Sequence, residues 1–95
     1  MSTAPQRPTL RVFRRPGCHL CDEARILIQA ALEERAVRGD PIPAVREIDV
    51  EGDPALEARY GVRIPVLELN GIELELATSA RQIRTFLDRA LGRLA

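Results

Sequence analysis

The sequence predicts a single α/β domain with the element order β-α-β-α-β-β-α, built on a four-stranded mixed sheet with helices on both faces. Two observations favour this class. Apolar and polar residues alternate in four short segments, and apolar residues recur at helical spacing in the stretches around them. A third is length, because 95 residues suffice for one hydrophobic core and not for two. We take residues 9–95 as the domain and residues 1–8 as a flexible tail.

The first three elements form a β-α-β unit. The segment Thr9–Phe13 predicts a strand, which a Pro-Gly pair ends. A helix that ends at Gly39 follows, and Val45–Val50 predicts the second strand. Because a helix joins the two strands, we expect them to lie parallel through a right-handed crossover. The apolar stripe of the helix consists of Leu20, Ala24, Leu27, Ile28 and Ala31.

The second half predicts a short helix, a hairpin and a final helix. Asp53 begins the short helix and Gly61 ends it, and Val62–Leu69 and Ile72–Leu76 predict two strands. The Asn-Gly pair between them suits a tight hairpin, so these strands are antiparallel. Ser79 begins the final helix in a capping-box pattern. The stripe of this helix consists of Ile83, Phe86, Leu87, Ala90, Leu91 and Leu94.

Composition argues against two classes of partner. The chain has 14 basic and 14 acidic side chains and three aromatic residues, so neither its charge nor its rings suit nucleic acid. Its apolar stretches are far shorter than the roughly 20 residues that cross a membrane. Residues 1–8 contain no apolar segment typical of a signal peptide. We therefore expect a cytoplasmic monomer.

Cys18 and Cys21 stand where the first strand passes into the first helix. Unsatisfied N–H groups and the helix dipole favour a thiolate there, and lower a cysteine pKa from about 8.5 to roughly 3.5–7.5. Three residues of separation allow a disulfide, and structural disulfides are rare in the cytosol. We therefore predict a redox pair in which Cys18, nearer the exposed end, attacks and Cys21 resolves.

Several charged residues and one proline flank this pair. Arg14 and Arg15 favour the thiolate by their charge, whereas the acidic side chains of the first helical turn oppose it. His19 is either solvated or a modulator of the redox potential. Pro65 interrupts a predicted strand and removes a ladder donor. We expect a cis peptide there, which places the backbone of Ile64 beside the thiols.

Three alternatives remain for the cysteines. They can be buried and inert, or belong to a domain that kept its fold and lost its activity. They can also carry a metal or an iron–sulfur cluster. A cysteine pair with the only histidine falls short of the four ligands that zinc prefers, although a dimer that shares the metal would supply them. We predict no metal site within one chain.

Together these motifs resemble the glutaredoxin-like proteins of the thioredoxin superfamily. The matching segments are Arg15-Pro16-Gly17-Cys18-His19-Leu20-Cys21, Tyr60-Gly61-Val62, Arg63-Ile64-Pro65-Val66 and Asn70-Gly71. The resemblance implies a thioredoxin-like fold with strand order 2-1-3-4. It also implies Cys18 as nucleophile, Cys21 as resolving thiol and Pro65 as the cis-proline of a thiol–disulfide oxidoreductase. His19 and Leu20 replace the usual Pro-Tyr between the cysteines, which indicates a divergent subgroup.

The resemblance further implies a substrate site. Arg15 occupies the position of a lysine that contacts a glutathione carboxylate, and the backbone of Ile64 would pair with the glutathione cysteine. Thr78 and Ser79 replace the Gly-Gly and aspartate that hold the other end of glutathione, and open N–H groups at Ser79 suit a carboxylate. Expected substrates are protein disulfides or glutathione mixed disulfides. No cofactor is expected to be bound, and glutathione or a reductase system is the candidate electron donor.

Overall fold

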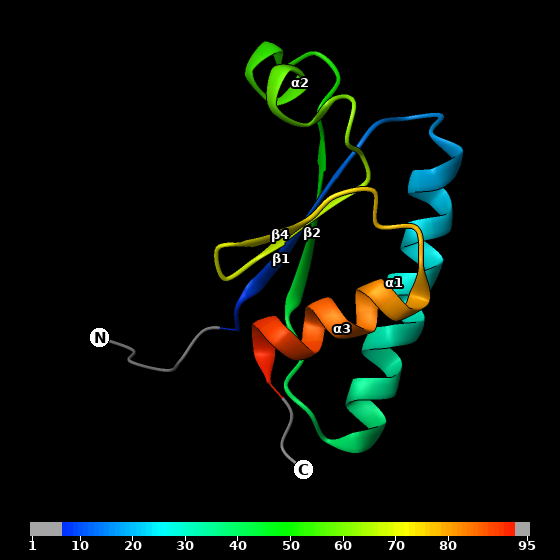
Figure 1. The fold of residues 1–95 in the computed structure, drawn as a ribbon, viewed down its shortest axis with the longest axis vertical. Coiled ribbons are helices and arrows are strands. Elements are labelled where there is room, and N and C mark those ends of the chain that lie inside the picture. Colours follow the sequence, from blue (N-terminus) through cyan, green and yellow to red (C-terminus); the bar gives the residue numbers. More distant parts are fainter. Residues whose placement is uncertain (1–6, 93–95) are drawn as a thin grey trace.

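The computed structural model describes residues 7–92, whose elements follow the predicted order (Figure 1). The elements are β1 (Thr9–Arg14), α1 (His19–Arg38), β2 (Ala44–Asp49), α2 (Pro54–Tyr60), β3 (Val66–Leu69), β4 (Ile72–Leu74) and α3 (Ala80–Leu91). The strands form one sheet in the order β2-β1-β3-β4. Strands β1 and β2 are parallel and the other two pairings are antiparallel, which confirms the predicted topology. Residues 1–6 of the predicted tail and Leu94 lie outside the described residues.

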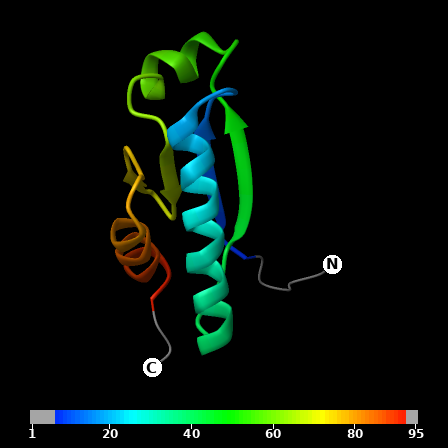
Figure 2. The same cartoon turned by 90° about the vertical axis from the view of Figure 1, so that its right-hand side faces the viewer.

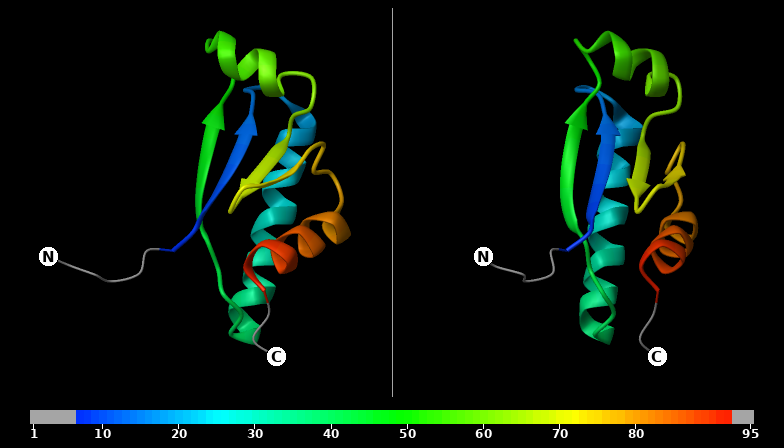
Figure 3. Two further views of the ribbon diagram at one scale, coloured as in Figure 1. Left: turned by 60° about the vertical axis from the view of Figure 1, so that its left-hand side comes forward. Right: turned by 90° about the vertical axis from the view of Figure 1, so that its left-hand side faces the viewer.

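Helices α1 and α3 lie on one face of the sheet, and the short α2 lies beyond the carboxyl ends of β1 and β2 (Figures 2 and 3). The main core fills the space between the sheet and the two long helices. A smaller core on the other side of β1 joins Leu56 of α2 to Phe13 and Tyr60, whose rings stack with centroids 4.0 Å apart. The end of the sheet near α2 is therefore packed on both faces.

Strand β1 separates the two cores by simple alternation. Leu10 and Val12 are buried in the main core, whereas Phe13 is buried in the smaller one. Successive side chains of a strand point to opposite faces, so the sequence Leu-Arg-Val-Phe places apolar groups on both. The predicted faces of these three residues are confirmed. Because β1 is an inner strand of the sheet and is packed on both faces, the point at which the chain enters α1 is fixed.

The third strand is shorter than predicted. The expected range Val62–Leu69 was wrong at its start, because the ladder begins only at Val66. The N–H of Arg63 bonds to the carbonyl of Tyr60 at 2.8 Å, which closes a turn directly after α2. Pro65 follows and has no N–H to donate to a ladder. The segment 62–65 is consequently a loop at the end of the sheet.

The fourth strand is also shorter than the predicted Ile72–Leu76, and ends at Leu74. Leu76 has a positive φ of 50°, which is incompatible with a strand. Its N–H bonds to the carbonyl of Arg63 at 2.9 Å instead of continuing the hairpin. The chain thereby leaves the sheet early and passes along the 62–65 loop before α3 begins.

A paired carboxylate connects α1 to the edge strand β2. Arg25 donates to both carboxylate oxygens of Glu47, at 2.7 and 2.9 Å, and this hydrogen bonding holds the pKa of Glu47 below its usual value. A depressed folded-state pKa adds stability above the unfolded pKa, which is lost as pH falls through the folded one. We expect Arg25→Gln to raise the pKa of Glu47 and to reduce the loss of stability as pH falls. An NMR titration of the carboxyl group measures it; an unchanged midpoint would contradict the expectation, and Arg46→Gln on β2 is the control.

Candidate active site

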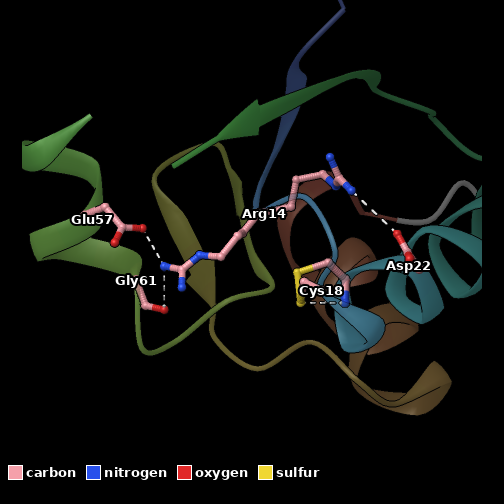
Figure 4. The surroundings of a disulfide bond; sticks show 7 residues. Arg14, Cys18, Asp22, Glu57 and Gly61 are labelled. Atoms are coloured by element: carbon pink, nitrogen blue, oxygen red, sulfur yellow. Dashed lines mark hydrogen bonds and ion pairs between the residues drawn. A yellow bond between two sulfur atoms is a disulfide. The ribbon is translucent and has the colours of Figure 1, made fainter. Parts of the chain in front are cut away.

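Cys18 and Cys21 are joined by a disulfide at the first turn of α1, with their Cα atoms 5.2 Å apart (Figure 4). Cys18 is the N-cap of the helix, and its Sγ accepts the N–H of Cys21 at 3.1 Å. Cys18 is half-buried, whereas Cys21 is 2% exposed. Of the two cysteines, Cys18 is therefore the one that an incoming substrate can reach.

The chain between β1 and α1 is shaped to place Cys18 at that cap. Gly17 has a φ of 71°, a left-handed conformation that glycine adopts without steric cost. Cys18 itself is extended, with φ −91° and ψ 111°, and its carbonyl accepts the N–H of Asp22 at 3.1 Å as the helix begins. The sulfur atom thus takes the place of the oxygen that usually caps a helix.

Two arginines flank the disulfide, and each meets a carboxylate. Arg14 pairs with Asp22 at 3.5 Å. Arg15 reaches α2, where it pairs with Glu57 and donates to the carbonyl of Gly61 at 3.4 Å. Figure 4 shows Asp22 on one side of the disulfide and Glu57 with Gly61 on the other. Positive charge near the sulfur atoms is therefore balanced on both sides.

Glu57 is a site residue that sequence reasoning missed. It lies 42 positions after Arg15, in the first turn of α2, where an acidic residue is common because it complements the helix dipole. No local pattern distinguishes it from any other helix-start glutamate. Its proximity to the chain between β1 and α1 depends wholly on how α2 packs at the end of the sheet.

The peptide between Ile64 and Pro65 is cis, as the sequence predicted. Phe13 pairs with Val66, so continuing this antiparallel register brings Ile64 beside Arg15, in the segment that leads to the cysteines. None of the hydrogen bonds between described residues uses the N–H or carbonyl of Ile64. The loop therefore presents unused backbone groups at the end of the sheet where the disulfide lies.

The segment before α3 is pinned to the same loop. The N–H groups of Leu76 and Ala77 bond to the carbonyls of Arg63 and Pro65, both at 2.9 Å. These two bonds lie on either side of Ile64 and leave its own backbone groups free. They also bring the chain that continues into the start of α3 to this end of the sheet.

The remaining predicted site residues differ in their placement. Thr78 is exposed next to this pinned segment, and Ser79 is the N-cap of α3, with its Oγ accepting the N–H of Gln82 at 3.3 Å. His19 is exposed and pairs with Glu23 at 3.0 Å, one turn along α1. Thr78 and Ser79 thus directly follow the two residues that bond to the 62–65 loop, whereas His19 pairs with its own helix.

Two further properties of residues 7–92 bear on this site. No three or more His, Cys, Asp or Glu side chains in that range are grouped so that they could hold a metal ion. Among the helices of the same range, none has the length and apolar character needed to cross a membrane.

Gly61 permits the close approach of Arg15 to α2. Its φ of −51° is right-handed, so it does not end the helix by a left-handed turn as glycine often does. A Cβ here would lie 2.6 Å from the carbonyl oxygen of Glu57 and 3.3 Å from the Arg15 guanidinium. We expect Gly61→Ala to lower stability by about 1–3 kcal/mol through this overlap. Urea unfolding measures the loss, and Val62→Ala, at a 95% exposed position, serves as the control; equal midpoints would contradict the expectation.

Comparison with known proteins identifies the fold family. The model of the family described as "Glutaredoxin-like domain (DUF836)" matches residues 9–90. The X-ray structure of the target protein XcR50 from X. campestris is similar, with 36% identity, a TM-score of 0.69, and coverage of 85% of this chain and 97% of that one. The solution structure of the same target has a TM-score of 0.67 at 36% identity, and covers 85% of this chain and 94% of its own.

A more distant structure has the same fold. Protein Ne2328 from Nitrosomonas europaea is 22% identical, with a TM-score of 0.59 over 90% of this chain and 98% of its own. No curated protein matches the sequence. The family model covers most of the chain, and the range that it matches includes the cysteine pair at the start of α1. This chain belongs to the glutaredoxin-like domain family.

Proposed function

We propose that this protein is a thiol–disulfide oxidoreductase that reduces protein disulfides or glutathione mixed disulfides through the dithiol of Cys18 and Cys21. The observation that carries the proposal is the disulfide at the N-cap of α1, with one half-buried and one fully buried cysteine. A helix N-terminus stabilises a thiolate by its N–H groups and dipole. The unequal burial supports different roles for the two sulfur atoms.

The reaction begins from the reduced dithiol. The Cys18 thiolate attacks one sulfur of a substrate disulfide, and the other substrate sulfur leaves as a thiolate that takes a proton from water. Cys21 then loses its proton and attacks Cys18 Sγ, which releases the first substrate sulfur as a second thiolate. Two electrons have passed to the substrate, and the protein carries the Cys18–Cys21 disulfide. Two glutathione thiols or the dithiol of a reductase return the electrons.

The other predicted residues have supporting roles in this proposal. The free N–H and carbonyl of Ile64 beside Pro65 suit an extended substrate backbone at the disulfide. Thr78 and Ser79 would contact the polar ends of glutathione where that is the partner, and Arg15 would do so only where a carboxylate of glutathione displaces Glu57. His19 would act only from the rim. The protein would work in the cytosol, where glutathione and thioredoxin reductase are both available.

Comparing the two electron donors tests the proposal. The wild-type protein is assayed on a protein disulfide with NADPH and either glutathione plus glutathione reductase or thioredoxin reductase. We expect one of the two donors to support turnover above the protein-free reaction. The family resemblance favours glutathione as the donor, whereas the absence of the Gly-Gly stretch argues against it. If neither donor, nor dithiothreitol as a chemical reductant, supports catalysed exchange, the proposed function is wrong.

A further inference from the structure

The cationic side chain beside the disulfide, that of Arg15, already forms an ion pair with an acidic residue of the same chain. Arg15 lies three residues before Cys18, and its side chain, 36% exposed, pairs with the 42% exposed Glu57. A substrate carboxylate that approaches the sulfur atoms must therefore compete with Glu57 for the guanidinium. The Nε of Arg15 is buried without a hydrogen-bond partner among the described residues, so the pair does not saturate its donors.

We infer that Glu57 sets the charge preference of this site by holding Arg15, so that neutral disulfides and thiols are favoured over anionic ones. The inference rests on the proposed function and names its substrate class: sulfur compounds without a carboxylate near the reacting sulfur. Glu57 is a specificity residue that acts through Arg15 and takes no part in the exchange itself.

Three exposed apolar side chains on the segments that form the site support the same substrate class. Val62, next to the Gly61 carbonyl that receives Arg15, is 95% exposed. Leu76, which bonds to the neighbouring Arg63, is 47% exposed, and Leu20 between the cysteines is 44% exposed. The cations that flank the disulfide are paired, whereas these apolar side chains are open to a partner. A neutral, apolar sulfur compound loses less hydration here than a charged one.

A bracing role for the same ion pair makes a different prediction. If Arg15 and Glu57 only hold α2 against the cysteine loop, replacing either residue loosens the site for every substrate alike. If Glu57 instead masks a charge, its replacement changes the ratio of rates between anionic and neutral reactants. The ratio within one variant is therefore the decisive quantity, because a general loss of folding cancels from it.

The experiment measures reduction of the Cys18–Cys21 disulfide by three small thiols: anionic mercaptopropionate, neutral mercaptoethanol and cationic cysteamine. Each thiol attacks Cys18 Sγ and expels the Cys21 thiolate, which is protonated; a second thiol molecule frees Cys18 and leaves as the oxidised dimer. Acid-quenched samples are tagged with maleimide and the protein thiols are counted by mass. Rates are divided by those of the same thiols on dimethyl disulfide, a neutral disulfide that none of the three thiols forms on oxidation, which removes their intrinsic reactivity.

We expect Glu57→Gln to raise the ratio of the anionic to the neutral rate about fivefold, the upper end of what one exposed ion pair contributes. The gain should shrink as salt shortens the Debye length from about 10 Å at 0.1 M to about 3 Å at 1 M. The matched control is Glu33→Gln, which removes the same charge from α1 roughly 20 Å along the helix from Cys18. It should leave the ratio unchanged.

A second pair of variants tests whether Glu57 acts through Arg15. In an Arg15→Gln background, Glu57→Gln should lose most of its effect on the ratio, since the released cation is gone. A gain of equal size without Arg15 would overturn the assignment, and so would an unchanged ratio in Glu57→Gln alone. Those results would not contradict the proposed function, because the disulfide of the wild type would still react with mercaptoethanol faster than the reference disulfide does. A protein disulfide that reacts no faster than dimethyl disulfide with any thiol would count against the proposed function itself.

Discussion

Cys18→Ser should reduce disulfide exchange to the uncatalysed rate, whereas Cys21→Ser should stop turnover at a trapped intermediate. Cys18 caps α1 and is the half-buried member of the pair, so it alone combines access with the helix N-terminus. A serine hydroxyl does not ionise near neutral pH and cannot form a bond to the substrate sulfur that is later exchanged. Without Cys18, the 2% exposed Cys21 has no path to a protein disulfide.

The trapped intermediate distinguishes the two roles. In Cys21→Ser, Cys18 still attacks, but the protein has no second thiol to release the substrate, so a mixed disulfide with Cys18 accumulates when no other thiol is added. Intact mass after incubation with a disulfide substrate shows the adduct, and a coupled assay shows the lost turnover on protein disulfides. Full activity in Cys18→Ser, or an adduct on Cys21 in that variant, would reverse the assignment.

Arg35→Met should cause the largest loss of stability outside the cysteine site. Arg35 is 2% exposed and donates to the carbonyls of Pro41 and Gly92, at 2.7 and 2.5 Å, and to Asp88 at 2.8 Å. It thereby joins the end of α1 to the following loop and to the end of α3. Methionine fills the aliphatic part of the space and leaves all three acceptors without their donor.

The expected cost is about 3 kcal/mol, near the lower end for breaking a buried ion pair, because Asp88 retains access to water. That loss corresponds to a Tm roughly 12–24 °C lower for a domain of this size. Urea unfolding at constant slope measures it. Arg84→Met on α3, whose exposed guanidinium lies 3.6 Å from Glu34, should change stability by less than about 1 kcal/mol. Similar losses in both variants would show that Arg35 is not a special anchor.

The order of elements and the sheet were predictable because their signals are local. Alternation in β1 assigned Leu10 and Val12 to one face and Phe13 to the other, and the Asn-Gly turn made β3 and β4 antiparallel. Periodicity failed only where the backbone departs from regular geometry. The loop before Val66 and the positive φ of Leu76 depend on hydrogen bonds between distant segments, which alternation of residue types does not encode.

The position of the cysteine pair was visible in the sequence for the same reason. A Cys-x-x-C spacing directly after a predicted strand places both sulfur atoms at a helix start, and the helix begins there. The cis bond before Pro65 was also predicted, from a proline where a strand needs a donor. By contrast, His19 belongs to the motif by position only, since its side chain pairs with Glu23 along the helix.

The sequence by itself determined the family, the topology and the position of the two cysteines at the start of a helix, since each follows from the spacing of residues that lie close together in the chain. Only the tertiary structure decided which charges surround them. Arg15 meets Glu57 across 42 residues and Arg35 meets Asp88 across 53. With 14 basic and 14 acidic side chains in the chain, many pairings satisfy the same composition. Packing of α2 and α3 against the sheet selects among them, because ion pairs form only between side chains that the fold brings within a few ångströms.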